Sequence, residues 1–179
     1  MTEVFTGVEE ALTYTGEGIK TNPCLAVDLA MLGAGTIEEC HAVLVASGIS
    51  TADGISHMPD EGAELDVNGN TVVFGETMMW FDVDSTMEDA IMQFGDGNAA
   101  IVAVKLNEED PNDEAMHLIL LAGQFIKNGE RSAVLVGDSL HDGMQRELAT
   151  QINKRLQRTL DWAGALFSYH VSVTKHSEK

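Results

Sequence analysis

The middle third of the chain decides how its secondary structure is interpreted: "AAIVAVKLNEEDPNDEAMHLILLAGQFIKNGERSAVLVG", residues 99–137. Residues 99–106 are a short, continuous apolar run, which predicts a central strand. Asp110 and Pro111 then predict a helix start, because proline fits the first helical position, and "KNG" predicts where that helix ends. Residues 131–137 predict a further strand. Strand, helix and strand in succession indicate an α/β or intermixed α+β fold.

The same alternation extends toward the N-terminus. Residues 9–15 predict a first strand. Asn22 is a capping residue and Pro23 fits the first helical position, so a helix is expected from there to about Leu32, stopping in "GAG". Residues 41–47, at the start of "HAVLVASGIS", predict a strand that ends in a serine- and glycine-containing turn.

Further strands and helices are predicted on both sides of the central stretch. Residues 50–70 indicate a polar, glycine-rich loop, and residues 71–81 a strand with a bend at Gly75. Ser85 and Glu88 have the spacing of a capping box, so the next helix is expected to start there and to end before "GDGN". Toward the C-terminus, "WAGALFSYHVSV" predicts a final strand, and the segment 143–158 before it an exposed helix.

Length and charge restrict the possible functions. The 179 residues fit one domain, spanning residues 1–179, and 44% of them are hydrophobic. A net charge of −19 disfavours nucleic acid and anionic membranes as partners, because like charges repel. The charge fits a small cationic substrate, or equally a salt-adapted or merely soluble surface. The absence of an 18-residue apolar run and of a signal-peptide pattern predicts a cytoplasmic protein without a transmembrane helix.

The candidate metal ligands are scattered. No two of the six histidines have i,i+4 spacing on a predicted helix, so no metal site is expected. "GDSLHDG" brings Asp138, His141 and Asp142 together, which suits either a cation-binding loop or, more simply, a solvated turn. Cys24 and Cys40 form no CxxC pair and are expected to be small buried hydrophobes.

One resemblance is to the enzyme IIA domains of the sugar phosphotransferase system, through "FGDGN" and the later "DEAMHL". It implies a phosphohistidine carrier in which His57, in "GISHMP", accepts phosphate and His117 assists. Histidine suits this role because neutral imidazole is a nucleophile near neutral pH. The alternative for His117 is a helix residue at the edge of the core.

A longer stretch, "TGEGIKTNPCLAVDLAMLGAGTIEECHAVLVASGI" (residues 15–49), resembles the N-terminal part of pyruvoyl-dependent arginine decarboxylases. The helix pattern of that family is matched by Ala26, Asp28, Ala30, Leu32, Ala34 and Gly35. "FDVDSTMEDAI" and "WAGALFSYHV" resemble later segments in the same order. The resemblance implies a layered α-β-β-α sandwich with mixed sheets, assembled as a homotrimer or a dimer of trimers.

The resemblance also implies a reaction, the conversion of arginine to agmatine and CO2. Family members cut their backbone between two serines and convert the second into a pyruvoyl group, which acts as the electron sink for decarboxylation. Ser47 matches the first serine, but Gly48 stands at the second position and has no hydroxyl. Asp28 matches the residue that meets the substrate guanidinium, with Ile49 and Met31 as further substrate contacts.

Two interpretations follow from the missing hydroxyl. Ser50 could be the displaced pyruvoyl precursor, with Glu108 as the proton donor. Otherwise the chain keeps the fold as a non-catalytic homologue, and "ASGIS" is only a turn. Asp28 borders the apolar face of its predicted helix, which also allows a solvent-facing role. Residues 78–81, "MMWF", are expected in the core or in a subunit interface.

Overall fold

The computed structural model describes residues 3–12, 24–53, 59–92, 94, 95, 97–105, 110, 112, 116–138 and 143–175. Within these residues the chain forms an α+β domain built on one nine-stranded sheet, in which every pairing is antiparallel. The strand order is β2-β3-β9-β5-β6-β7-β8, while β1 pairs with β6 and β4 with β9. The α+β class is therefore confirmed, whereas two layered sheets of mixed direction are not shown.

The centre of the sheet is a meander of three long strands: β5 (Asn98–Lys105), β6 (Met116–Lys127) and β7 (Glu130–Asp138). The helix predicted to end at "KNG" is wrong, because Met116–Lys127 is a strand that pairs on both sides. Its continuous apolar sequence serves both faces of the sheet, since Leu118 and Leu120 enter one core cluster and Ile119 and Leu121 the other. A strand buried on both faces shows no period of two.

The sequence "KNG" does mark a turn with left-handed backbone, but such a turn can end a helix or join two strands. Asn128 and Gly129 have φ of 56° and 79° and form the two-residue turn between β6 and β7. Asn-Gly is favoured in such hairpins because both central residues need positive φ. The same left-handed conformation also ends helices, so the dipeptide alone does not distinguish the two.

The remaining strands extend the sheet on both sides. On one side, β9 (Leu166–Thr174) pairs along its length with both β3 (Asn70–Phe74) and β4 (Met78–Trp80), and β2 (Glu64–Val67) lies outside β3. The break between β3 and β4 at Gly75 confirms the predicted bend. On the other side lie β8 (Gly143–Leu148), next to β7, and β1 (Val4–Gly7), which pairs with the far half of β6.

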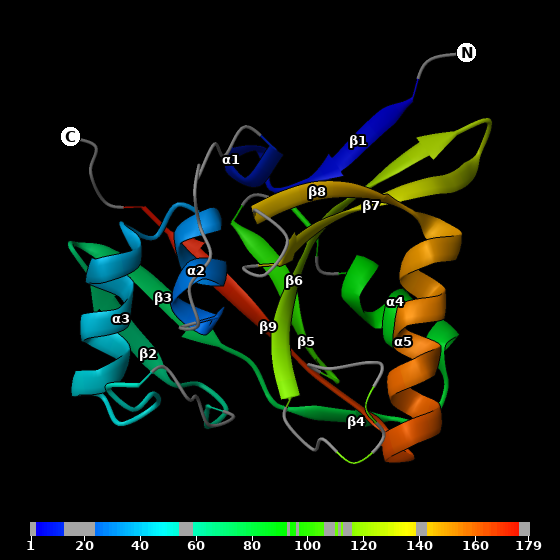
Figure 1. Cartoon of the computed structure of the whole chain (residues 1–179). Helices are drawn as coiled ribbons and strands as arrows, with labels where there is room; N and C mark the ends of the chain where they lie inside the picture. Colours follow the sequence, from blue (N-terminus) through cyan, green and yellow to red (C-terminus); the bar gives the residue numbers. More distant parts are fainter. Residues whose placement is uncertain are drawn as a thin grey trace.

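Helices cover both faces of the sheet (Figure 1). One face carries α2 (Cys24–Met31) and α3 (Ile37–Ala46), and the other carries α4 (Val83–Met92) and α5 (Ala149–Ala163); the short α1 (Glu9–Leu12) follows β1. Two clusters of buried apolar side chains result, one on each face. None of the described helices is long and apolar enough to cross a membrane.

The strand predicted for residues 41–47 is wrong, because α3 occupies this segment. Thr36 and Glu39 form a complete capping box at its start. Only Cys40 and Leu44 are buried, at the i,i+4 spacing of one helix face, while Val45 is exposed. Short apolar runs fit both element types, and here the upstream cap decides between them.

Three smaller predictions also need correction. The first strand, expected at residues 9–15, is the helix α1 as far as the structure describes it. The loop at 50–70 contains β2, whose hairpin with β3 turns at Asn68 and Gly69. The helix expected at 143–158 begins only at Ala149, since the preceding six residues form β8 at the sheet edge.

The helix predicted from Ser85 exists but starts earlier. Asp82 caps it by accepting hydrogen bonds from the main-chain N–H and the hydroxyl of Ser85, so α4 begins at Val83. The predicted helix before "GAG" is confirmed as α2, and the strands predicted at 99–106, 131–137 and the C-terminus are confirmed as β5, β7 and β9.

Candidate functional site

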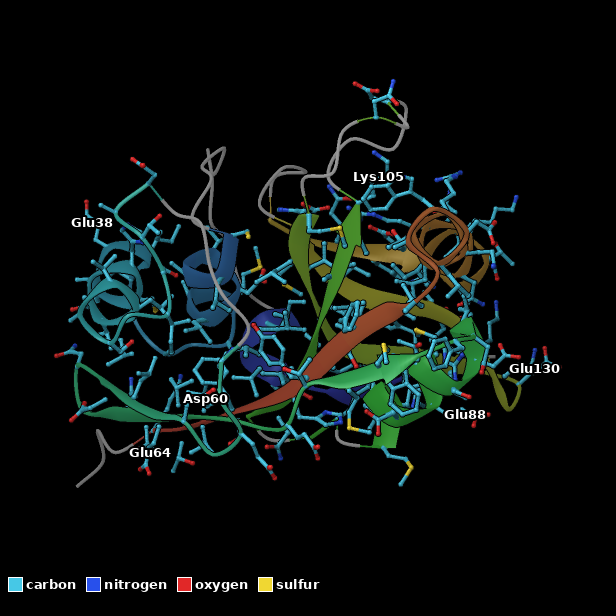
Figure 2. The ribbon with its side chains drawn as sticks, turned by 90° about the horizontal axis from the view of Figure 1, so that it is seen from below. Glu38, Asp60, Glu64, Glu88, Lys105 and Glu130 are labelled. Carbon is cyan, nitrogen blue, oxygen red and sulfur yellow. The ribbon has the colours of Figure 1, made fainter. Side chains whose placement is uncertain are left out.

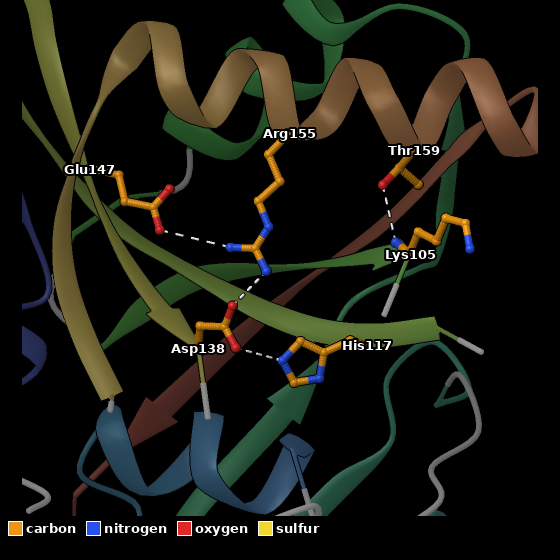
Figure 3. A network of polar contacts seen from close by, with 6 residues as sticks. All are labelled: Lys105, His117, Asp138, Glu147, Arg155 and Thr159. Carbon is orange, nitrogen blue, oxygen red and sulfur yellow. Dashed lines mark hydrogen bonds and ion pairs between the residues drawn. The ribbon is translucent and has the colours of Figure 1, made fainter. Parts of the chain in front are cut away.

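A buried polar network lies where β6 begins and β7 ends. His117 is the second residue of β6 and Asp138 the last residue of β7, and both are almost completely buried. His117 Nε2 and Asp138 Oδ1 are 2.7 Å apart, and Arg155 of α5 donates from Nη2 to Asp138 Oδ2 at 2.5 Å. Figure 3 shows Arg155 reaching down from α5 to the carboxylate that also holds the imidazole.

The network keeps the carboxylate of Asp138 ionised. Burial by itself would raise its pKa, but the hydrogen bond with His117 and the positive charge of Arg155 together lower the pKa well below its usual range. Arg155 is in turn held by Glu147, with 3.8 Å between Nη1 and Oε2. Asp138 is therefore a fixed negative charge that orients the imidazole of His117.

A cysteine contacts the strand that carries His117. Cys24 is the first residue of α2, which packs on β6 and β7. Its sulfur accepts a hydrogen bond from the main chain of Leu118, the residue that follows His117. Burial, followed by the charge of Asp28, raises the pKa of the thiol to about 11, and the Leu118 amide opposes this rise. The resting side chain is thus a thiol near neutral pH.

His117 and Cys24 approach from different faces of the sheet. Along β6, Leu118 and Leu120 contact the cluster under α2, whereas Ile119 and Leu121 contact the cluster under α5. Strand alternation therefore directs His117 to the α5 side. Cys24 lies on α2, which packs on β6, β7 and β8, and Figure 3 shows α2 just below the strand ends.

Asp28 lies one helical turn after Cys24 and is completely buried. Neither of its carboxylate oxygens has a hydrogen-bond partner among the described residues, and the same holds for the buried hydroxyl of Tyr169. Burial, reinforced by the charge of Asp138, raises the pKa of Asp28 well above its usual range. Burial and the charges of Asp28 and Cys24 also raise the pKa of Tyr169.

The predicted processing segment lies at a helix end. Ser47 is the C-cap residue of α3, and its hydroxyl donates to the carbonyl oxygen of Leu44. Gly48 has φ of 82°, the left-handed conformation that commonly ends helices. The main-chain N–H groups of Ile49 and Ser50 both donate to Leu44. The strand end expected here is therefore wrong, and "ASGIS" forms a helix C-terminal turn.

The structure brings together only part of the predicted set. Met31 is buried on α2, against Gly137, and so shares a helix with Asp28. His57, Glu108, His141 and Asp142 lie outside the described residues. Within the described part of the chain, no three His, Cys, Asp or Glu side chains gather as a metal site would require.

The sequence indicates three residues of the site, but for roles that differ from those in the observed network. For His117, the sequence suggests either an assisting role in phosphoryl transfer or a place on a helix. The predicted helix is wrong, because His117 lies in the strand β6. The sequence suggests a cation-binding or solvated turn for Asp138, yet this residue is buried. It predicts Cys24 only as a small buried hydrophobe and does not indicate Arg155. The signal that could have identified Cys24 is its position directly after Asn22 and Pro23, at a predicted helix start.

No model of a known protein family matches this chain, and no curated protein matches it in sequence. The function therefore has to be inferred from the geometry of the site itself.

Proposed function

We propose that the protein is a cysteine-dependent acyl-transfer enzyme, a hydrolase of an amide or ester in which Cys24 is the nucleophile. One observation carries the proposal: the strand that carries the buried, hydrogen-bonded His117 of the His117–Asp138 pair also contacts the sulfur of Cys24, through the main chain of Leu118. A thiol, a histidine and a residue that orients the histidine form the recurring arrangement of nucleophilic catalysis by cysteine.

In the proposed reaction, His117 removes the proton of the Cys24 thiol. Because Nε2 is bonded to Asp138, the proton would be received at Nδ1. The thiolate attacks the substrate carbonyl, a carbon–sulfur bond forms, and His117 returns the proton to the leaving amine or alcohol. Water, deprotonated by His117, then hydrolyses the thioester and regenerates the thiol. Asp138 stays ionised throughout and stabilises the imidazolium.

Two features of the fold favour the ionised form of the Cys24 thiol. The N-terminal end of a helix carries a partial positive charge, which favours an anion at Cys24. The main chain of Leu118 also donates to the sulfur. Burial opposes both effects and leaves the thiol protonated at rest, so a general base is required.

The test uses the second buried cysteine as a matched control. We expect hydrolysis of p-nitrophenyl acetate that is abolished in Cys24→Ala and retained in Cys40→Ala, since Cys40 lies on α3. His117→Gln should lower the rate by about 10²–10⁴-fold, the usual contribution of a general base.

Intact mass should detect an acetyl group on the wild type that is absent from Cys24→Ala. Because alternation directs His117 to the α5 face, the same measurement on His117→Gln also tests whether the imidazole reaches the thiol at the end of the sheet. Equal ester hydrolysis in Cys24→Ala and Cys40→Ala would refute the proposal.

A second candidate is the decarboxylase suggested by the sequence resemblance, favoured by one observation. Asp28 is a buried acid without a partner among the described residues, which suits a guanidinium group. This candidate includes the layered α-β-β-α sandwich with mixed sheets, the homotrimer or dimer of trimers, a pyruvoyl group from Ser50, and Glu108 as proton donor. Intact mass tests it, because processing at Ser50 would split the chain into fragments of 49 and 130 residues, and an unbroken chain would refute it.

A further inference from the structure

One side chain of the buried network takes no direct part in the proposed reaction. Arg155 lies on α5, and its side chain is 12% exposed. Its Nη2 is 2.5 Å from Oδ2 of Asp138, while Nε2 of His117 is 2.7 Å from Oδ1 of the same carboxylate. Each carboxylate oxygen thus has a partner of its own, so the group cannot turn about its Cβ–Cγ bond without losing a short hydrogen bond. Arg155 therefore fixes the direction from which Asp138 meets the imidazole.

The charges of these three side chains determine where a proton is favoured. Without Arg155, the buried carboxylate of Asp138 would favour a proton on the imidazole, because an opposite charge nearby stabilises a charged group. The guanidinium already balances the carboxylate, and it stays protonated at any ordinary pH. A second positive charge, on His117, would lie in the same buried site and would be repelled by Arg155. The carboxylate therefore does not need a protonated imidazole to balance its charge.

We propose that Arg155 is a positioning residue for the reaction of Cys24: through Asp138, it orients the imidazole of His117 and keeps it in the neutral form that accepts a proton. The catalytic part of this inference rests on the proposed function, in which Nδ1 receives the proton of the thiol. Nε2 must then carry the hydrogen that is donated to Asp138. An ionised carboxylate can only accept a hydrogen bond, so Arg155 also supports this tautomer.

Two neighbouring elements contribute further acidic groups. Cys24 and Asp28 lie on α2, which packs on β6 and β7, but burial raises the pKa of both groups and so disfavours a negative charge on either. Glu147 lies on β8, and its Oε2 is 3.8 Å from Nη1 of Arg155. Glu147 interacts with the same guanidinium as Asp138, which weakens the effect of Arg155 on the imidazole. Neutralising Glu147 should therefore have the opposite effect to neutralising Arg155.

Other charged groups of the surrounding elements have partners elsewhere. Lys105 of β5 donates to the main-chain oxygen of Asp110, Asp89 of α4 pairs with His170, and Arg146 of β8 pairs with Glu3. Figure 2 shows further carboxylates at the rim of the molecule that point away from its body, and all of them are exposed: Glu38, Asp60, Glu64, Glu88 and Glu130. Water and salt screen exposed charges, so the buried guanidinium has the larger effect on the pair.

The experiment follows the imidazole of His117 by NMR as the pH is changed, with the signal identified by its loss in His117→Gln. In Arg155→Met the titration midpoint should move to higher pH by about one unit or more, the usual effect of a neighbouring charge. Arg155→Lys keeps the cation and should restore most of the wild-type value, and Glu147→Gln should move the midpoint to lower pH. The matched control is Arg158→Met, which removes an exposed cation from the same helix and should leave the midpoint unchanged.

Hydrolysis of p-nitrophenyl acetate gives the functional readout. A smaller fraction of the imidazole is neutral in Arg155→Met, so the rate below the midpoint should fall by about tenfold for each unit of the shift. The acid side of the pH–rate profile should move by the same amount as the NMR midpoint, and the rate should recover at higher pH. A loss of activity that is equal at every pH would show only a structural role for Arg155 and would overturn the proposal.

The titration has its own contrary outcomes. An unchanged or lowered midpoint in Arg155→Met, or equal shifts in Arg155→Met and Arg155→Lys, would overturn the proposal. If Arg155→Met does not fold, Glu147→Gln decides, because an unchanged or raised midpoint there contradicts the same balance of charges. Titration shifts without Cys24-dependent ester hydrolysis would refute only the proposed function, and hydrolysis without titration shifts would refute only the role of Arg155.

Discussion

Asp28 and Asp138 are two buried aspartates with pKa values shifted in opposite directions. Asp138 gains His117 and Arg155 as partners, whereas Asp28 has none among the described residues and feels the negative charge of Asp138. The sign of each shift depends on whether a partner offsets the loss of hydration. The sequence does not contain this information, because the partners come from β6, β7 and α5.

Asp28→Asn should stabilise the protein more at pH 7 than at pH 4. The raised pKa of Asp28 means that the folded state favours its protonated form, so the contribution to stability is present below the unfolded value, about 3.9, and is lost as the pH rises. Asparagine cannot ionise and keeps the shape. Urea unfolding measures the change in the free energy of unfolding at each pH. The cost of burying the amide is the same at both pH values, so it cancels when the two changes are compared. An equal change at both pH values would contradict the raised pKa.

Asp138→Asn should behave in the opposite way. Its lowered pKa contributes stability that is present above the unfolded value of about 3.9 and is lost as the pH falls toward the lower folded pKa. Breaking the buried pair should cost about 3–5 kcal/mol at pH 7, and the difference from wild type should shrink toward pH 2. Urea unfolding checks this, with the exposed Asp53→Asn as a control that follows the wild type. A difference independent of pH would show that the charge of Asp138 is not stabilising.

At the scale of elements, the sequence predicts β3, β4, β5, β7 and β9 but confuses strand and helix in several other segments, of which two show the reason. Residues 41–46 form a helix because the Thr36 cap fixes its start, although the apolar run alone suits a strand. Met116–Lys127 forms a strand because it pairs with two neighbours, although the upstream proline suggests a helix. In both cases a short apolar run is ambiguous, and contacts outside the run decide its conformation.

The β6–β7 turn permits a prediction at this scale. Gly129→Ala should destabilise the protein by about 1–2 kcal/mol, the cost of forcing an alanine into the left-handed region. Gly129 has φ of 79° and open space where the Cβ of an alanine would lie, so only backbone strain is introduced. Gly95→Ala is the matched control, since Gly95 also has open space but no positive φ. Thermal unfolding of both variants tests this prediction. Equal unfolding midpoints for Gly129→Ala and Gly95→Ala would argue against a strained turn.

At the scale of the whole molecule, the acidic surface is the dominant property. The net charge of −19 is spread over exposed carboxylates, which repel one another in the compact state. The charge is readable from composition alone, whereas the alternation of patterns left the α/β and α+β classes open and its central helix is the strand β6. The sheet order is not predictable, because β9 lies between β3 and β5 although it is last in the chain.

Salt should therefore stabilise the protein at neutral pH. Raising NaCl from about 0.05 to about 1 M shortens the Debye length from about 14 Å to about 3 Å, so the midpoint of thermal unfolding should rise. The rise should be much smaller near pH 4.4, where the sequence predicts no net charge. Scanning calorimetry at both pH values measures this. An equal rise at both would indicate a general salting-out effect instead of screening.

The sequence by itself determined the net charge, the presence of both helices and strands, and a left-handed turn at Asn128 and Gly129, because these depend on composition and on neighbouring residues. Only the tertiary structure decided that His117 pairs with Asp138 and that Cys24 contacts the main chain of Leu118, the residue after His117. Cys24 and Asp138 lie 93 and 21 residues from His117 along the chain, so both contacts depend on strand register and helix packing. The opposite pKa shifts of Asp28 and Asp138 follow from the same packing, since burial and partners are properties of the folded chain.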